Sequence, residues 1–161
     1  ISVSIFMGSK SDLPVVQAAA DTLNEFNVPH RMFILSAHRT PEEVVKRVKE
    51  SEADGAKIFI AAAGMAAHLA GAVAAHSTRP VIGIPIESGG MGGMDSLLST
   101  AMMPPGVPVA TVAVGKAGAK NSAILAVQIL ATSDVELSQK LHDYKNNMRE
   151  EVLKKDKALN S

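Results

Sequence analysis

The sequence contains no cysteine and no tryptophan, and it has only one tyrosine and four phenylalanines. The absence of cysteine excludes disulfide bonds, thiolate catalysis and cysteine-based zinc sites. It agrees with a reducing compartment, and we expect the protein to be cytoplasmic. With so few aromatic side chains, the core must consist of small and aliphatic residues, which requires the backbones of helices and sheet to approach closely.

Net charge and long apolar runs are also lacking. Sixteen basic residues balance sixteen acidic ones, so the formal net charge at pH 7 is zero. Proteins that bind nucleic acids usually carry a basic excess, so we predict a small molecule or another protein as the partner and no nucleic acid. No apolar run reaches the roughly 20 residues of a membrane-spanning helix, and we expect no membrane association.

The sequence does contain a regular alternation of short apolar runs with longer helical patterns. Continuous apolar runs are typical of strands covered on both faces, as in a parallel sheet. The alternation predicts a single α/β domain over residues 1–161: a three-layer αβα sandwich with a flavodoxin-like sheet of five parallel strands. The expected strands are 2–7, 31–35, 57–62, 81–85 and 109–114, and the expected helices are 12–26, 41–53, 66–76, 95–102 and 117–130.

A further long helix is expected at the C-terminal end, over residues 134–157. Its apolar residues recur every three or four positions and so form one stripe, as in an amphipathic helix. The stripe consists of Leu137, Leu141, Tyr144, Met148 and Val152. The residue pattern leaves open whether this stripe packs on its own domain or covers a neighbouring subunit.

Two polar turns follow the first two expected strands. The first is Gly8-Ser-Lys-Ser-Asp12, and the second is Ser36-Ala-His-Arg-Thr-Pro41. Thr40, Pro41 and Glu43 predict a capping box at the helix that follows the second turn. Because both turns leave the carboxyl edge of a parallel sheet, where open α/β sheets bind ligands, we expect them to line one crevice.

The residue types in these turns suit a phosphorylated sugar and a proton transfer. Ser9 and Ser11, at the start of a helix, can donate to a phosphate, and Asp12 can accept from ribose hydroxyls. Arg39 can bind phosphate through two parallel hydrogen bonds. His38 can take or release a proton near neutral pH. The plainer alternative is a pair of surface turns in which Ser11 or Asp12 only caps a helix.

Two later stretches contain many small residues. The first, 61–71, follows the expected central strand and includes Gly64 and His68, which we expect to face the crevice. The second, 87–95, is rich in glycine and is expected to close over a ligand, with Asp95 or Ser96 capping the next helix. Neither a phosphate-binding nor a dinucleotide-binding glycine motif occurs, and no HExxH motif or acidic cluster indicates a metal site.

Taken together, these stretches resemble the N5-carboxyaminoimidazole ribonucleotide mutase family of de novo purine biosynthesis. The matching stretches occur in order over nearly the whole chain, and the ordered set is highly specific. They are Met7-Gly-Ser-Lys-Ser-Asp12, Ser36-Ala-His-Arg-Thr-Pro41, Ala66-Ala-His-Leu69, Asp95-Ser-Leu-Leu-Ser99, Met103-Pro104, Gly106-Val-Pro-Val109 and Gly115-Lys-Ala-Gly118.

The resemblance implies an isomerase of IMP biosynthesis. It would move a carboxyl group from the exocyclic nitrogen to ring carbon four of an aminoimidazole ribonucleotide, by decarboxylation and recarboxylation, without ATP, metal or organic cofactor. It implies that His38 is the general acid/base, that Asp12 binds the ribose and that the 64–71 loop retains carbon dioxide. It also implies a homo-octamer whose sites draw on adjacent subunits and whose C-terminal helix joins the assembly.

The substrate-binding residues expected from the motifs and the resemblance come from three turns. Ser9, Ser11, Ser36 and Arg39 would hold the phosphate by family analogy. The full set is Gly8, Ser9, Ser11, Asp12, Ser36, Ala37, Arg39, Gly64, Ala66, His68 and Leu69.

Two other functions remain as alternatives. The related aminoimidazole ribonucleotide carboxylases use carbon dioxide directly but typically carry Gly-Arg-Ser-Asn where this chain has Gly64-Met-Ala-Ala-His68, which favours the mutase. A non-catalytic flavodoxin-like binding or signalling domain is disfavoured, because a phospho-receiver needs acidic residues after the first and third strands.

The chain departs from the family pattern at two positions. Met65 stands where the family commonly has glycine, and Ala70 stands where it commonly has proline.

Overall fold

The computed structural model describes residues 1–160. The contacts between residues divide the chain into two compact units, Ile1–Ala126 and the stretch from Val127 onward. The first unit contains the whole sheet, and the second contains the long C-terminal helix. The prediction that residues 1–161 form one functional domain stays a prediction.

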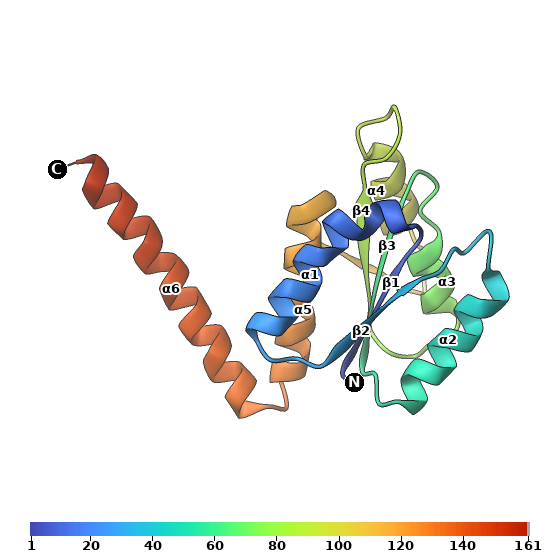
Figure 1. Cartoon of the computed structure of the whole chain (residues 1–161), viewed down its shortest axis with the longest axis horizontal. Helices are drawn as coiled ribbons and strands as arrows, with labels where there is room; N and C mark the ends of the chain where they lie inside the picture. The colour runs from blue at the N-terminus through green and yellow to red at the C-terminus, as the bar shows by residue number, and fades with distance from the viewer. Residues whose placement is uncertain (161) are drawn as a thin grey trace. The chain divides into compact units, whose positions relative to one another are not determined.

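The first unit is built on five parallel strands in the order β2-β1-β3-β4-β5 (Figure 1). This is the flavodoxin-like strand order, and the predicted fold is confirmed. The strands are β1 (Val3–Met7), β2 (His30–Ile34), β3 (Ile58–Gly64), β4 (Val81–Ile86) and β5 (Ala110–Thr111).

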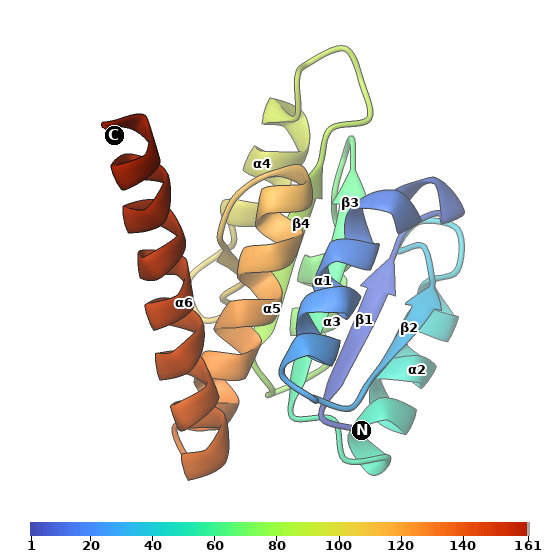
Figure 2. The ribbon, with the colours of Figure 1, turned by 60° about the vertical axis from the view of Figure 1, so that its left-hand side comes forward.

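Helices cover both faces of the sheet, which confirms the three-layer sandwich (Figure 2). In Figure 2, α1 and α5 lie over one face, and α2 and α3 lie over the other. Gly83 of β4 faces both Ala70 of α3 and Thr100 of α4, so α4 lies on the same side as α3. The helices are α1 (Leu13–Glu25), α2 (Pro41–Ala53), α3 (Leu69–Ala75), α4 (Met94–Ala101) and α5 (Gly115–Ala131).

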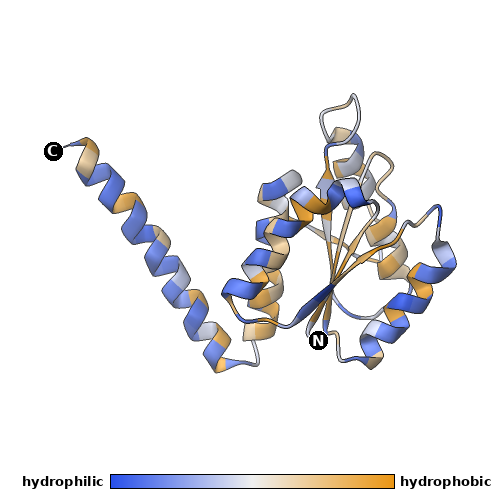
Figure 3. Cartoon of the chain, in the orientation of Figure 1, coloured by the Kyte–Doolittle hydropathy of each residue, from blue (hydrophilic) through white to orange (hydrophobic). Residues whose placement is uncertain are grey.

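The core is apolar and made largely of small and aliphatic residues, as the scarcity of aromatic residues predicts. Every residue of β1 and β4 is buried. The ring of Phe6 lies 5.6 Å from that of Phe33 and 5.7 Å from that of Phe59, measured between centroids. Helix α4 approaches β4 so closely that a Cβ at Gly83 would lie 2.2 Å from Thr100 Cγ2. Figure 3 shows apolar residues along the strands and polar residues on the outer face of α2.

Three predicted boundaries were wrong. Strand β5 covers only two residues of the expected 109–114, and Ala113 departs from extended structure with a φ of 131°. Helix α3 starts at Leu69 and not at 66, because the chain first turns at Met65, where φ is 54°. Helix α4 starts at Met94 after Gly93, which has a φ of 82°, so neither Asp95 nor Ser96 is its N-cap.

The second unit contains the end of α5 and the helix α6 (Val135–Leu159). Asp134 caps α6 by accepting a hydrogen bond of 3.0 Å from the backbone N–H of Leu137. None of the residues of α6 is buried, and Val135 and Val152 are strongly exposed. The predicted helix is present, whereas its packing on a neighbouring subunit stays a prediction. Within residues 1–160, no helix is both long and apolar enough to cross a membrane.

Candidate active site

Four turns meet at the carboxyl edge of the sheet, around the point between β1 and β3 where the strand order reverses. Ligands of open α/β sheets bind at such a point. The turns enclose a cavity of about 590 Å³. Its lining residues are Gly8, Ser9, Ser11, Asp12, Ser36, Ala37, His38, Arg39, Ala63, Gly64, Met65, Ala66, His68, Leu69 and Ser88. The structure therefore brings together every residue predicted for the site.

The turn after β1 holds its side chains through a capping box at the short 3₁₀ helix η1 (Lys10–Asp12). Asp12 Oδ2 accepts a hydrogen bond of 2.9 Å from the N–H of Ser9. Ser9 Oγ in turn accepts bonds from the N–H of Ser11, at 3.3 Å, and from the Ser11 hydroxyl, at 3.0 Å. Two hydroxyl groups are thus fixed beside backbone N–H groups at the start of a helix, an arrangement that attracts anions.

The carboxyl group of Asp12 is removed from water, since only 6% of the residue is exposed. Burial raises the pKa of Asp12 above its ordinary value of 3.8. Hydrogen bonds with Ser9, Ser11 and Gly8 and the charge of Arg39 oppose this rise. Each further hydrogen-bond donor stabilises the ionised form of such a carboxyl group, so hydroxyl groups of a ligand are suitable partners.

The turn after β2 is closed by Thr40, which serves the turn and not the helix. Thr40 Oγ1 accepts a hydrogen bond of 2.9 Å from the N–H of Ser36 and donates one of 3.0 Å to the Ser36 carbonyl. It makes no side-chain cap of α2, so the capping box predicted with Glu43 was wrong. These two hydrogen bonds join Ser36 to Thr40, so the loop that carries His38 is held at both ends.

Arg39 joins the first two turns. One of its terminal nitrogens donates a hydrogen bond of 2.9 Å to the carbonyl of Gly8, and its Nε donates one of 3.3 Å to Ser36 Oγ. A guanidinium group has five N–H donors, so three are left for a ligand. Arg39 therefore places a positive charge between the serines of the two turns, where a phosphate group fits.

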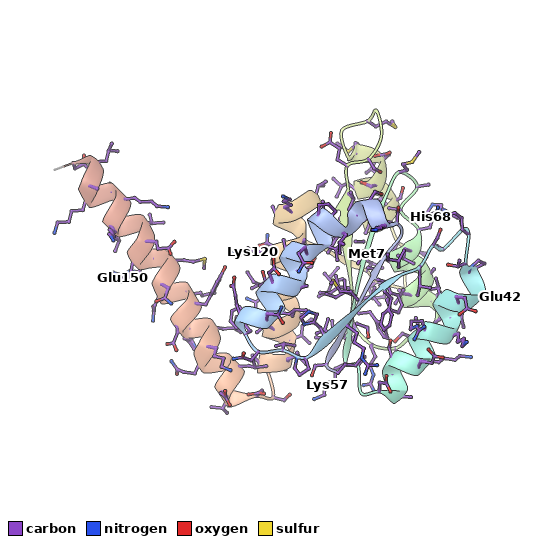
Figure 4. The ribbon with its side chains drawn as sticks, viewed as in Figure 1. Met7, Glu42, Lys57, His68, Lys120 and Glu150 are labelled. Atoms are coloured by element: carbon purple, nitrogen blue, oxygen red, sulfur yellow. The ribbon has the colours of Figure 1, made fainter. Side chains whose placement is uncertain are left out.

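His38 pairs with His68 inside the cavity. His38 Nε2 and His68 Nδ1 lie 2.8 Å apart, and the two rings meet edge to face at 75°. One of these two nitrogens must donate and the other accept, so they hold one proton between them. In Figure 4, His68 lies at the turn before α3. His76 is at the opposite end of α3, where its Nδ1 lies 2.8 Å from the carbonyl oxygen of Ala72.

Sequence reasoning missed three lining residues, Ala63, Met65 and Ser88. Ser88 follows β4, and its Oγ lies 1.8 Å from the point where Gly64 would carry a Cβ. Gly64 is thus required by the close approach of the turn after β4. The signal for Ser88 was available, because β4 was expected beside the central strand and its carboxyl end had to reach the same edge. Closure of the 87–95 loop stays a prediction.

The side chains of this cavity can therefore bind a phosphate, accept from sugar hydroxyls and move a proton. Arg39 and the serines carry donors of the kind that a phosphate requires, Asp12 carries acceptor oxygens, and the imidazoles of His38 and His68 are of a type that can transfer a proton. Within residues 1–160, no group of three or more histidine, aspartate or glutamate side chains is arranged to hold a metal ion.

Comparison with known proteins agrees with this geometry. Residues 2–151 match the family model described as AIR carboxylase. The chain belongs to the AIR carboxylase family. It is 49% identical to the N5-carboxyaminoimidazole ribonucleotide mutase of Escherichia coli (strain K12) over 151 residues, which cover 94% of this chain and 89% of that protein. It is 47% identical to the protein of the same name from Bacillus subtilis (strain 168), covering 98% of this chain and 97% of that protein.

Structural comparison leads to the same family. The crystal structure of Treponema denticola PurE superposes with a TM-score of 0.90 at 32% sequence identity. The match covers 99% of this chain and 98% of the other. The family resemblance found in the sequence is thereby confirmed.

Asp12→Asn removes a carboxyl group whose ionised form is penalised by burial. Because the pKa of Asp12 is raised in the folded protein, its stabilising contribution is complete below the ordinary value of 3.8 and is lost as pH rises through the raised pKa. We therefore expect the Asn variant to melt at a higher temperature than the wild type at pH 7, with the difference vanishing at about pH 3. Calorimetric melting across this pH range measures the effect.

Asp21→Asn is the matched control, since Asp21 is an exposed carboxylate on the following helix. Its effect on the melting temperature should be small at every pH. An Asp12→Asn variant that is less stable at pH 7, with a deficit that persists in acid, would contradict this account of Asp12.

Proposed function

We propose that the protein is an N5-carboxyaminoimidazole ribonucleotide mutase, an isomerase of purine biosynthesis. Its substrate carries a carboxyl group on the exocyclic nitrogen of an aminoimidazole ribonucleotide, and its product carries that group on ring carbon four. The relatives of this name, at 47–49% identity, support the activity. The observation that carries the proposal is that His38 lines the same cavity as Asp12, Arg39 and the serines.

In this proposal the phosphate of the nucleotide lies at the junction of the first two turns. Ser9, Ser11 and Ser36 donate hydroxyl hydrogens to it, and Arg39 supplies the positive charge. The hydrogen bonds of Arg39 with Gly8 and Ser36 keep the guanidinium in place before the ligand arrives. Asp12 accepts from the ribose hydroxyls.

His38 acts as general acid and then as general base. Its imidazolium protonates the exocyclic nitrogen as the N–C bond of the carbamate breaks, which leaves an amine and carbon dioxide. Ring carbon four then attacks carbon dioxide, forming the new C–C bond, and carbon four loses its proton to the same imidazole. One proton is given and one is taken back, so the reaction is an isomerisation that leaves the enzyme unchanged.

His68 orients the imidazole of His38. The contact of 2.8 Å between the two rings holds the His38 ring in one orientation before the substrate binds. Substrate then competes with His68 for the Nε2 of His38. We assign His68 a positioning role on this basis.

Carbon dioxide must not escape between the two bond changes. Part of the cavity wall consists of Ala63, Gly64 and Ala66, whose small side chains leave space close to the backbone. The glycine-rich loop 87–95 closes over the site once the substrate is bound, and closure excludes water from the reaction.

The alternative within the same family is direct carboxylation of aminoimidazole ribonucleotide by carbon dioxide. The family to which the chain belongs, AIR carboxylase, supports this reaction as the second candidate. It differs from the mutase reaction only in the source of carbon dioxide, since the attack from ring carbon four and the proton loss are the same.

We also propose a cytoplasmic homo-octamer in which α6 packs on a neighbouring subunit. The support is that α6 buries none of its residues and exposes Val135 and Val152. Apolar side chains along a long charged helix gain stability when another surface covers them. The mass of the native particle in solution is the direct measure of this state.

His38→Asn tests the acid/base assignment. The variant keeps the groups proposed to bind phosphate and ribose, so we expect product affinity close to that of the wild type, with kcat lowered by about 10²–10⁴. Steady-state rates and calorimetric titration with the product measure the two properties. His76→Asn, which alters a histidine outside the cavity, should leave both unchanged. A near-normal rate in the His38 variant would exclude it as the acid/base.

The choice of substrate is tested by two parallel assays of the wild-type protein. One supplies the carbamate, and the other supplies aminoimidazole ribonucleotide with bicarbonate. We expect efficient turnover of the carbamate at low bicarbonate. Efficient turnover of only the second mixture would assign the protein to the carboxylases.

A further inference from the structure

Met65 has a backbone conformation that its side chain disfavours. Its φ is 54°, in the left-handed region, where a bulky side chain is rare because its Cβ crowds the following carbonyl. Asn27 and Ala113 also have positive φ values, but asparagine tolerates this conformation and alanine carries only a methyl group. The side chain of Met65 gains little from burial in return, since the residue is 61% exposed. Strain of this kind persists mainly at sites where it serves a function.

The strained residue lies where the cavity meets the glycine-rich loop. Met65 follows β3 directly and lines the cavity. Its Cγ is 3.9 Å from the position that a Cβ of Gly89 would occupy. Gly64, the residue before Met65, lies so close to the Ser88 side chain that no Cβ would fit there. The left-handed backbone therefore places an apolar thioether beside the loop and over one side of the cavity.

We propose that Met65 sets how well the site retains carbon dioxide: its thioether forms an apolar wall against the substrate's aromatic base and closes the gap beneath the glycine-rich loop. This inference rests on the proposed mutase function. A polarisable sulfur makes favourable contacts with aromatic rings, and an apolar wall keeps water away from the reacting carbon. The neighbouring residues of the same turn, Gly64 and Ala66, have only a hydrogen atom and a methyl group as side chains.

Carbon dioxide has to be retained only between cleavage of the N–C bond and formation of the C–C bond. After the N–C bond breaks, carbon dioxide either forms the C–C bond at ring carbon four, with loss of one proton to His38, or diffuses out. The second outcome leaves aminoimidazole ribonucleotide as a side product. A shorter side chain at Met65 should raise the share of the second outcome without removing any group that binds phosphate or moves the proton.

The test compares Met65→Ala, Met65→Gly and Met65→Leu with the wild type, using the carbamate as substrate and measuring the ratio of aminoimidazole ribonucleotide to carboxylated product. The non-enzymatic breakdown of the carbamate is subtracted. We expect the ratio to rise about tenfold in the Ala and Gly variants, as for a missing apolar group in a pocket. Met65→Leu, which keeps the apolar volume, should stay near the wild-type ratio. Met102→Ala, which removes an exposed methionine outside the cavity, is the matched control.

Thermal melting of the same variants provides a readout that does not depend on activity. Met65→Gly relieves the backbone strain, so its melting temperature should equal or exceed that of the wild type and of Met65→Ala. A melting temperature well below that of the wild type would make Met65 a structural contact of the free protein and overturn the inference. Unchanged product ratios in the Ala and Gly variants would also overturn it. A wild type that does not convert the carbamate would instead refute the proposed function.

Discussion

The parallel pairing of β1 with both β2 and β3 is the constraint on which the site depends. Met7, the last residue of β1, lies opposite Ile34 on one side and Ala62 on the other. Backbone bonds extend this alignment past the end of β1, since Gly8 donates to the Ala62 carbonyl and Leu35 donates to the Met7 carbonyl. Three turns distant in sequence therefore begin at the same level. A different register would separate His38 from Asp12.

Within that frame, polar side chains hold one another in place before any ligand binds. Asp12 holds the backbone of Ser9, Arg39 joins Gly8 to Ser36, and His38 contacts His68. Preorganised groups do not have to be ordered during the reaction, which is the main source of electrostatic catalysis. The burial that raises the pKa of Asp12 belongs to the same arrangement, because the carboxyl group lacks part of its hydration in the free protein.

The sequence was sufficient to predict the strand order and most of the residues that line the cavity, because both follow from simple patterns. Mostly apolar runs of five or six residues marked the strands, and each polar turn directly followed one of them. Local side-chain bonding could not be predicted in the same way. Thr40 was expected to cap α2, but its hydroxyl instead closes the turn with Ser36. The capping box forms at Ser9 and Asp12, because Asp12 is the third residue of the short helix there.

Contacts between distant turns were also beyond sequence reasoning. The bond between His38 and His68 joins residues 30 positions apart, and it depends on side-chain rotamers that no periodicity encodes. The early turn at Met65, which delays the start of α3, involves a positive φ at a residue that normally avoids it. Propensity favoured a longer helix, whereas the turn at Met65 delays its start to Leu69.

The central claim is that one nucleotide lies across these turns, with its phosphate at Arg39 and its base at His38. A crystal structure of the protein with the carboxylated ribonucleotide product tests it most directly. The account predicts phosphate oxygens hydrogen-bonded to Arg39 and Ser36, ribose hydroxyls at Asp12, and ring carbon four about 3–3.5 Å from a nitrogen of His38. A product bound with its base at Arg39, or with carbon four out of reach of His38, would contradict the account.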